Sequence, residues 1–502
     1  MAVYRSLLRL HREEMTMLVL LGFAMIATFL YLVMSKRVVP VAALILVPVV
    51  FGLVAGGGLG LADDITKSIE DVAPTAALLF FAITFFGIMI DVGLFDPLIR
   101  AILRVVGHDP AKIVVGTALL ASIVSLDGDG STTFIIVTSA FLPIYLRLGM
   151  SPVVLTCVTA TANGVLNTVP WGGSTARAAA ALKVSPIDIF VPMIPAIAAG
   201  LIATMVFAYL LGRSERRRLG EVELRDGVLR RKDSASGKVP QTTRAAQMTP
   251  AEASGTVSVA VASGPSDPSD GNATTAAPEP KADTALISSD GTINRPNARP
   301  RLLWFNLALT LAVMALLVEG TLEPAVLFFV AVAIALVLNF PRVAEQREQL
   351  QAHASSVVGV VGMVFAATVL TGVLSGSGMV EAMADWLVGV IPDSLGAHFP
   401  VITGLLSIPM TFFTSNDAFY FGMLPVLNET ASHYGVTPLE MARASLVGQP
   451  LHQSSPIVAS FLLLVGLAKV DLGDHHRKTI WRAVVVGLIM LAVGGLTLAF
   501  PL

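Results

Sequence analysis

The sequence predicts an all-α integral membrane protein with about ten transmembrane helices and two opposed re-entrant hairpins, arranged as an inverted repeat. The first observation is composition, because 54% of the 502 residues are hydrophobic, 14% are charged, and the mean hydropathy is +0.76. The second is a pair of acidic interruptions in apolar sequence, SLDGDGSTT at residues 125–133 and FTSNDAF at residues 413–419. The third is that both halves of the chain carry the same motifs in the same order. Together these observations predict an inverted-repeat secondary transporter fold.

Composition and charge also narrow the class of protein. A soluble core of this length needs fewer apolar residues, so we expect a multi-pass membrane protein whose first apolar segment is retained as a span. The single cysteine, Cys157, allows neither a disulfide framework nor a multi-thiolate metal site, and we expect it to be a packing residue. The formal net charge of -2 gives no reason to expect a nucleic-acid partner.

A hydrophilic segment divides the chain into two membrane halves. Residues 213–301 are rich in Ser, Thr, Pro, Gly and Ala and have hardly any aromatic residues, which predicts a disordered linker, placed in the cytoplasm by its basic start. The expected organisation is a basic N-terminal extension at residues 1–15, a first membrane repeat at 16–212 with a hairpin near 111–146, the linker at 213–301, and a second membrane repeat at 302–502 with a hairpin near 399–427.

Several apolar segments are too short to cross a bilayer as straight helices, which is typical of re-entrant or broken helices around a transport site. The segments of the first half are residues 16–34, 38–61, 74–90, 111–126, 132–146, 152–169 and 187–211. Those of the second half are residues 302–318, 324–340, 355–374, 399–413, 418–427, 438–447, 456–470 and 480–500.

The two halves share an ordered set of motifs. Each has a Phe-Ala dipeptide, a pair of glycines, an acid three residues after the second glycine, an acidic interruption, a Leu-Pro dipeptide and a Gly-x-x-Pro turn. The matching residues are Gly87, Gly93, Asp96, Pro143 and Pro152 in the first half, and Gly372, Gly378, Glu381, Pro425 and Pro438 in the second. A chance match of one motif is easy, but the shared order predicts an internal repeat.

Charge placement predicts that this repeat is inverted, because basic loops of membrane proteins are cytoplasmic. The basic positions of the first half are residues 35–37, 100–112, Arg147 and 213–218. Segments 111–126 and 132–146 must then enter and leave on the cytoplasmic side, with the first acidic interruption as a hairpin tip. The acidic loop at 427–435 lies outside by the same argument, so the second hairpin opens outward. Both tips are predicted to meet near the midplane.

Both predicted tips carry side chains with oxygen ligands. They are Asp127, Asp129, Ser131 and Thr132 in the first tip and Ser415, Asn416 and Asp417 in the second. Such hard oxygens suit Mg²⁺, Ca²⁺, Na⁺ or a proton rather than a soft metal. We expect Asp127, Asp129 and Asp417 to contact a metal cation. Asp129 and Asp417 are also candidate proton carriers, since burial favours a neutral carboxylic acid. Ser131 and Ser415 could equally cap the following half-helix.

A further interruption follows each hairpin. In residues 160–179, two asparagines one turn apart precede Pro-Trp-Gly-Gly, after which a helix should restart with an N-terminus that favours anions. Arg177 could grip a carboxylate or anchor the chain at the membrane interface. His452 could relay protons or only pack, and His475 and His476 are expected to be solvated. The candidate substrate-binding residues are Asn163, Asn167, Gly172, Gly173, Ser174, Thr175, Arg177, Gln449, His452 and Ser454, with Ser131, Thr132, Ser415 and Asn416 at the tips.

These motifs resemble a known family. The chain resembles the bacterial citrate-divalent metal:proton symporter family, within the ion transporter superfamily, in LDGDGSTT (126–133), VPWGGSTARA (169–178), FFTSNDAF (412–419) and GQPLHQSSPIV (448–458). The resemblance implies import of citrate complexed with a divalent cation, in symport with protons, through elevator-like alternating access. It also implies scaffold and transport domains and a homodimer in the plasma membrane. It implies no enzyme activity and no cofactor beyond the cation of the substrate.

The charges of the tips agree with such a substrate. A free citrate trianion would be repelled by the aspartates, whereas a metal complex presents its cation to them and its carboxylates to Arg177. Three alternatives stay open. A sodium-coupled di- or tricarboxylate carrier of the same superfamily would keep the hairpins. An intramembrane aspartyl protease would need two aspartates close enough to share a proton, which the repeat argues against, and a channel would not show counterflow.

Overall fold

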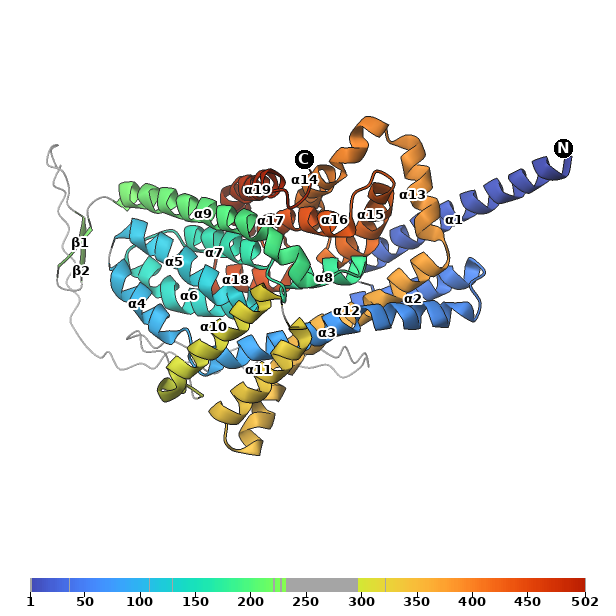
Figure 1. Ribbon diagram of the computed structural model, residues 1–502. Coiled ribbons are helices and arrows are strands. Elements are labelled where there is room, and N and C mark those ends of the chain that lie inside the picture. Colours follow the sequence, from blue (N-terminus) through green and yellow to red (C-terminus); the bar gives the residue numbers. More distant parts are fainter. Residues whose placement is uncertain are drawn as a thin grey trace, which may run out of the picture. The chain divides into compact units, whose positions relative to one another are not determined.

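The structure is a computed structural model, which describes eight ranges of residues (Figure 1). They are residues 2–35, 37–107, 109–128, 130–219, 222–225, 228–231, 297–320 and 322–501. Asp129 and most of the predicted linker lie outside the described residues. The chain divides into two units, residues 1–220 with 286–502, and residues 221–285. The smaller unit is described only by the antiparallel strands β1 (Val222–Arg225) and β2 (Val228–Arg231).

The described part of the larger unit is helical, and its first half follows the predicted order. It contains α1 (Ala2–Met34), α2 (Pro40–Val54), α3 (Gly60–Asp91), α4 (Asp96–Val106), α5 (Pro110–Val124), the 3-10 turn η1 (Ser125–Asp127), α6 (Gly130–Arg147), α7 (Pro152–Leu166), α8 (Gly173–Leu182) and α9 (Pro186–Leu219). One boundary differs from the sequence prediction, because α9 continues through the basic segment 213–219, which the sequence assigns to the linker. Arg and Leu are good helix formers, and basic side chains suit a helix C-terminus.

The second half repeats this order. It contains η2 (Pro300–Leu302), α10 (Leu303–Glu319), α11 (Pro324–Asn339), α12 (Val343–Gly376), α13 (Met379–Val390), η3 (Asp393–His398), α14 (Phe399–Phe413), the π-helical turn η4 (Ala418–Met423), α15 (Leu424–Ser432), α16 (Pro438–Ser445), η5 (Leu446–Gly448), α17 (Gln449–His452), α18 (Ala459–Ala468) and α19 (Leu472–Leu496). Proline occupies the first turn of α11, α14 and α16, where its missing N–H costs no helical hydrogen bond.

The backbone supports the internal repeat at unusual positions. The turns after α3 and α12 contain Gly93 and Gly378, with φ angles of 81° and 72°. The half-helices α8 and α18 are both 10 residues long. Each ends at a lysine in the left-handed region, Lys183 at φ 53° and Lys469 at φ 51°. Because few non-glycine residues adopt positive φ, two equivalent lysines in this conformation are a strong sign of duplication.

Membrane-spanning capacity agrees with the predicted fold class. Within the described residues, 8 helical segments are long and apolar enough to cross a membrane, namely residues 15–33, 60–91, 110–127, 186–219, 300–317, 343–376, 394–413 and 472–496. Shorter apolar helices are α2, α7, α11 and α18. α5 and α14, within two of the long segments, are the first arms of the predicted hairpins, while α7 and α18 belong to the interrupted helices. The chain is therefore a multi-pass membrane protein.

The first hairpin opens at the C-terminal end of α9. There, Arg218 donates a 2.7 Å hydrogen bond to the carbonyl of Gly149, just after α6. Arg216 lies 3.8 Å from Asp109, the residue that caps the start of α5. The start of α5 and the end of α6 therefore meet the same turn of α9, as a re-entrant hairpin requires.

The second hairpin opens at the other end of α9. Phe399, at the start of α14, stacks on Tyr434, just after α15, with ring centroids 5.8 Å apart. Leu182, at the end of α8 next to the start of α9, packs in the same apolar cluster as Phe399. The first turn of α9 also accepts a 2.8 Å hydrogen bond at Asp188 O from Arg443 of α16. The two hairpins thus point in opposite directions, as the inverted repeat predicts.

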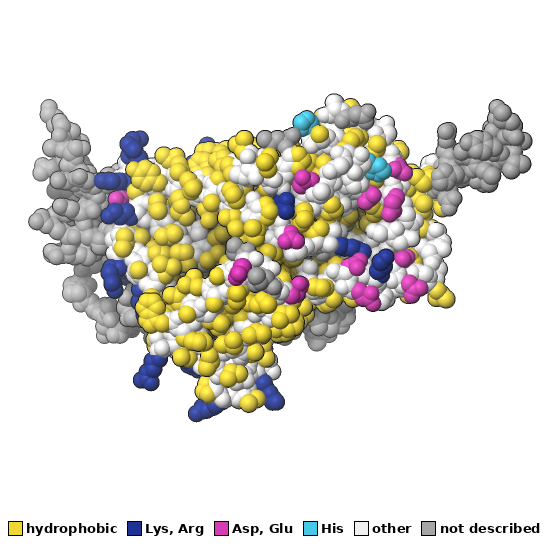
Figure 2. Space-filling view, in the orientation of Figure 1, with side chains coloured by type: hydrophobic (Ala, Val, Ile, Leu, Met, Phe, Trp, Pro, Cys, Tyr) yellow, Lys and Arg dark blue, Asp and Glu magenta, His cyan; other side chains and the backbone are white. Residues whose placement is uncertain are grey.

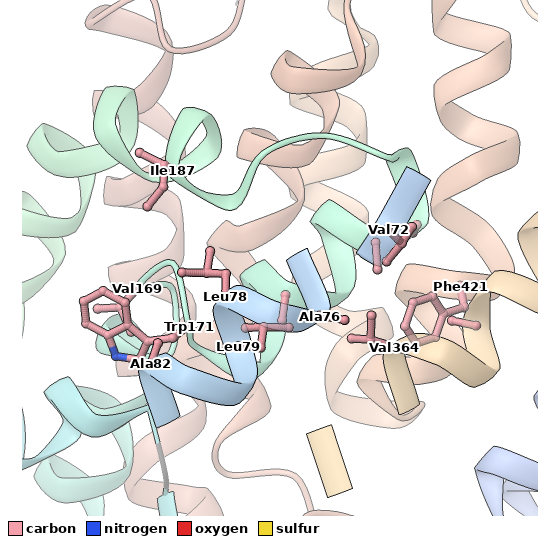
Figure 3. Close-up of a cluster of buried hydrophobic side chains, with 14 of the residues drawn as sticks. Val72, Ala76, Leu78, Leu79, Ala82, Val169, Trp171, Ile187, Val364 and Phe421 are labelled. Atoms are coloured by element: carbon pink, nitrogen blue, oxygen red, sulfur yellow. The ribbon is translucent and has the colours of Figure 1, made fainter. Parts of the chain in front are cut away.

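An apolar core holds the first interruption, residues 167–172, against α3. Figure 3 shows Trp171 beside Ala82 of this helix, near Val169 and Leu78. The indole stacks on Phe86, with ring centroids 4.4 Å apart, and its Nε1–H donates to Leu126 O at 2.7 Å. Trp171 therefore connects the core to the first hairpin tip.

The close contact between α7 and α17 depends on Gly164, which has no side chain. A Cβ atom at this position would lie 2.6 Å from Gln449 O and 2.6 Å from Pro450 Cα, which are backbone atoms that cannot move alone. We expect Gly164→Ala to destabilise the fold by about 1–3 kcal/mol, measured as a lower thermal unfolding midpoint of the purified protein in detergent. Gly359→Ala in α12 is the matched control, since its Cβ would meet nothing within 4 Å. Equal midpoints for both variants would contradict this packing.

Candidate functional site

A buried ion pair joins the two halves of the protein. Arg177 projects from α8, and its Nε lies 2.5 Å from Oδ1 of Asp417, at the second hairpin tip. The Asp417 residue is 7% exposed, and the Arg177 side chain is 19% exposed. Arg177 Nη1 also donates to Gly173 O at 2.7 Å, which fixes the guanidinium along its own helix. The sequence analysis predicted both residues as site residues, but it did not predict that they pair with each other.

An amide cluster lies beside this ion pair. It consists of Asn167, Ser174, Asn416 and Gln449, two residues from each half, all buried. Asn167 Nδ2 donates to Ser174 Oγ at 2.7 Å and to Gln449 Oε1 at 3.2 Å. Asn416 and Gln449 exchange hydrogen bonds of 3.3 and 3.2 Å between their amide groups. Tyr420 extends the cluster, because its hydroxyl accepts from Gln449 Nε2 at 3.0 Å.

The first hairpin tip packs against the first interruption, residues 167–172. Gly128 adopts φ 80°, and a Cβ atom there would lie 3.1 Å from Trp171 Cδ1, so this turn requires glycine. Asn163 Nδ2 donates to Ser125 Oγ at 2.8 Å. Asp127 is buried at the end of η1, with 6% of its surface exposed. The tip is therefore a packed, polar turn inside the protein.

Each half-helix meets the hairpin of the other half. α8, from the first half, carries Arg177 to the second tip. α18, from the second half, begins beside the first tip, since a Cβ at Gly130 would lie 3.0 Å from Ser460 Oγ and 3.3 Å from Asn163 Oδ1. Both tips and both restarting helices therefore converge, as predicted for a transport site at the repeat interface.

The second interruption, residues 453–458, supports the second hairpin. Nδ1 of His452 lies 2.6 Å from Thr411 O, and a carbonyl only accepts, so the ring donates from this nitrogen. Ser455 Oγ donates to Phe412 O at 2.6 Å. Both carbonyls belong to the last turn of α14, directly before the tip. His452 is therefore a buried histidine that is hydrogen-bonded to the last turn of α14, next to the second tip. Ser454 lies two residues further along the chain.

The prediction that His475 and His476 are solvated is wrong for His475, while His476 is half-buried. His475 is completely buried, with Nδ1 3.0 Å from Thr156 Oγ1 of α7 and Nε2 3.1 Å from Ser454 Oγ. His476 Nε2 lies 2.8 Å from Ser454 O. The neighbouring charged residues suggested an exposed loop, but α19 already begins at Leu472 and turns both rings toward the second interruption. Cys157, by contrast, is a buried packing residue, as expected.

The predicted metal ligands are only partly described. Asp127 and Asp417 belong to separate tips, and Asp129 lies outside the described residues. Among the residues that the structure does describe, no group of three or more His, Cys, Asp or Glu side chains is placed to hold a metal ion. Ser415 Oγ accepts from the backbone N–H of Ala418 at 3.1 Å, a capping arrangement. Contact of the three aspartates with a cation stays a prediction.

The structure thus brings most predicted site residues to one region. Asn167, Ser174, Arg177, Asn416, Asp417 and Gln449 are linked by hydrogen bonds or the ion pair; Asn163 binds the first tip; Gly172, Gly173 and Thr175 form the start of α8; Ser131 and Thr132 lie in the first turn of α6. Sequence reasoning missed Ser125, Tyr420 and Ser460. Each is a polar group in or next to an interruption, which is the signal that could have identified it.

Comparison with known proteins agrees with this geometry. A profile of the citrate transporter family matches residues 29–448. A citrate transporter of Bacillus subtilis is 44% identical over 474 residues, covering 94% of this chain and 97% of that protein. A Mg(2+)/citrate complex secondary transporter of the same organism is 43% identical over 478 residues, covering 95% and 98% of the two chains.

A solved structure shares the fold. The crystal structure of the YdaH transporter of Alcanivorax borkumensis aligns with a TM-score of 0.52 at 15% identity, covering 88% of this chain and 89% of that chain. The family match covers more than half of the sequence, and the relatives are matched over nearly their whole length. This chain therefore belongs to the citrate transporter family and is a multi-pass membrane transporter rather than an enzyme.

Proposed function

We propose that this protein imports citrate as a complex with a divalent metal cation, in symport with protons. The names of its relatives support citrate, and one of them names a complex with Mg²⁺. The observation that carries the proposal is the Arg177–Asp417 ion pair at the meeting point of the two halves. Such a pair offers one site to an anion and one site to a proton.

Charge balance explains why a proton and a metal complex would move together. In the described arrangement, the guanidinium and the carboxylate neutralise each other. Protonation of Asp417 would release Arg177. The guanidinium could then bind a carboxylate group of citrate through a bidentate pair of hydrogen bonds. A complex of trivalent citrate with one divalent cation carries a single negative charge, so Arg177, protonated Asp417 and the bound complex would together again be neutral. Free citrate would leave two uncompensated negative charges in a buried site, which is costly.

The surrounding groups fit the remaining polar atoms of such a ligand. The first amide N–H groups of α8, from Gly173 to Thr175, have no partner within their own helix and lie at its positive end. Asn167, Asn416 and Gln449 supply amide donors and acceptors for carboxylate and hydroxyl oxygens. The cation would face oxygens of the first tip, among which Asp127 is described and Asp129 is not.

Alternating access is part of the same proposal. The two hairpins open toward opposite ends of α9, so movement of the site could expose it first to one side and then to the other. We propose an elevator-like movement of the hairpins and half-helices, as a transport domain, against a scaffold of the remaining helices in a homodimer. Exposed apolar side chains on α10 and α11, such as Trp304 and Val337, leave a surface for lipid or for a second copy.

Replacing Asp417 by asparagine separates coupling from binding. The amide resembles the protonated acid but cannot give up a proton, so Arg177 would stay free for substrate. We expect Asp417→Asn to lower pH-gradient-driven citrate uptake into proteoliposomes at least about tenfold, while counterflow of preloaded Mg²⁺–citrate persists. Asp71→Asn is the matched control, since it removes the acid of an ion pair with Lys183 (2.9 Å) outside the interruptions. Normal gradient-driven uptake by Asp417→Asn would remove this carboxylate from the coupling mechanism.

Metal dependence tests the substrate itself. We expect uptake of labelled citrate by the wild-type protein to require a divalent cation, because the bare trianion leaves the site charged. The measurement is initial uptake with Mg²⁺, Ca²⁺, Mn²⁺, Zn²⁺ or Fe³⁺, with chelator alone, and with or without an imposed pH gradient. Chelation should reduce the rate by about tenfold or more. Uptake that needs sodium and no divalent cation would instead support a sodium-coupled carboxylate carrier.

A further inference from the structure

Helix α4 has three distinct faces. Ile99, Ile102 and Val106 point into the protein and are buried. Leu98 and Val105 lie on a second face, where they are 42% and 74% exposed. Arg100 and Arg104 form a third face, one helical turn apart and both exposed. A helix with one protein-facing side, one exposed apolar side and one basic side fits the boundary between acyl chains and headgroups.

The buried side of α4 packs against α5, the first arm of the first hairpin. A Cβ atom at Gly116 of α5 would lie 2.4 Å from Val106 Cγ2 and 3.4 Å from Ile102 Cγ2, so these side chains rest directly on the backbone of α5. The chain also connects α3 to α5 through α4. Whatever binds α4 therefore acts on an arm of the hairpin whose tip contains Asp127.

The end of the molecule at which α4 lies is basic. Lys and Arg side chains gather where Figure 1 labels α4, α5 and α9, and Asp and Glu gather toward the other end (Figure 2). Among the residues that the structure describes, neither Arg100 nor Arg104 forms an ion pair. By the positive-inside rule this end faces the cytoplasm, where membrane surfaces carry anionic lipids.

The equivalent helix of the other half has the opposite charge. α13 follows α12 through Gly378, as α4 follows α3 through Gly93. It carries Glu381 and Asp385, both exposed and also one helical turn apart, and no lysine or arginine. The connection alone therefore does not require arginines. Their presence on α4 matches the leaflet that this helix would touch.

We propose that α4 is an interfacial helix that binds the phosphate headgroups of anionic lipids in the cytoplasmic leaflet through Arg100 and Arg104. Leu98 and Val105 enter the acyl region, while the two guanidinium groups reach the lipid phosphates. Binding there holds the first arm of the first hairpin in place and makes transport sensitive to the anionic lipid content of the membrane.

The test compares lipid-dependent stability of the purified protein in detergent. We expect phosphatidylglycerol, and not phosphatidylcholine, to raise the thermal unfolding midpoint of the wild type. The double variant Arg100→Gln/Arg104→Gln should need roughly thirtyfold more phosphatidylglycerol for the same rise, or about fivefold for each arginine. Arg342→Gln/Arg347→Gln, at the start of α12, is the matched control with the same loss of charge, and it should respond like the wild type.

Four outcomes would overturn the proposal. Equal stabilisation by phosphatidylcholine would mean that the protein does not recognise the charge of the lipid headgroup. An unchanged response of Arg100→Gln/Arg104→Gln would place the lipid site elsewhere. An equal loss in Arg342→Gln/Arg347→Gln would reduce the effect to net charge. Inorganic phosphate that matches the effect of phosphatidylglycerol would show that the arginines bind a free anion and not a lipid. None of these outcomes depends on which solute the protein transports.

Discussion

A buried pair of opposite charges, contributed by the two halves, is the constraint on which the arrangement of the helices depends. Removing one partner of a fully buried pair costs about 3–5 kcal/mol, because the other charge is left unpaired, and the cost is lower here to the extent that the Arg177 side chain is 19% exposed. Arg177 and Asp417 can meet only if α8 restarts in the interior and the second hairpin stops there. The interruption at residues 167–172 and the turn before η4 make both possible, and Trp171 anchors the first of them.

Close backbone approach is the second requirement. Gly164 lets α7 contact the backbone of α17, Gly128 lets the first tip turn against Trp171, and Gly130 leaves room for Ser460. A side chain at Gly164 would separate elements that supply the amide cluster, and one at Gly128 or Gly130 would displace the first tip. The side chains of the amide cluster are thereby hydrogen-bonded to one another, which is necessary where water and lipid cannot supply hydrogen bonds.

The sequence predicts the hairpins, the interruptions and most of the residues that the structure brings together between them, because carboxylates, glycines and prolines within apolar segments have few structural explanations. It did not predict the Arg177–Asp417 bond, since pairing across 240 positions depends on tertiary geometry. The burial of His475 is not predictable from the sequence, because the adjacent charges indicate a solvated loop, whereas burial depends on which side of α19 faces the interruption. The predicted start of the linker at residue 213 differs from the end of α9 at Leu219, because a basic segment can continue a helix as readily as begin a linker.

Duplication and divergence have separate consequences in this fold. The shared backbone, down to the left-handed Lys183 and Lys469, produces two oppositely directed hairpins. The sequence differences between the two halves determine where charged side chains lie. The position in α18 equivalent to Arg177 is occupied by Leu463, so a fixed cation stands at only one of the two half-helices. A symmetric site with two arginines would favour a polyanion, whereas one arginine paired with one titratable acid favours a ligand of low net charge. For the proposed function, the asymmetry of the repeat, rather than its symmetry, would therefore favour a metal complex over free citrate.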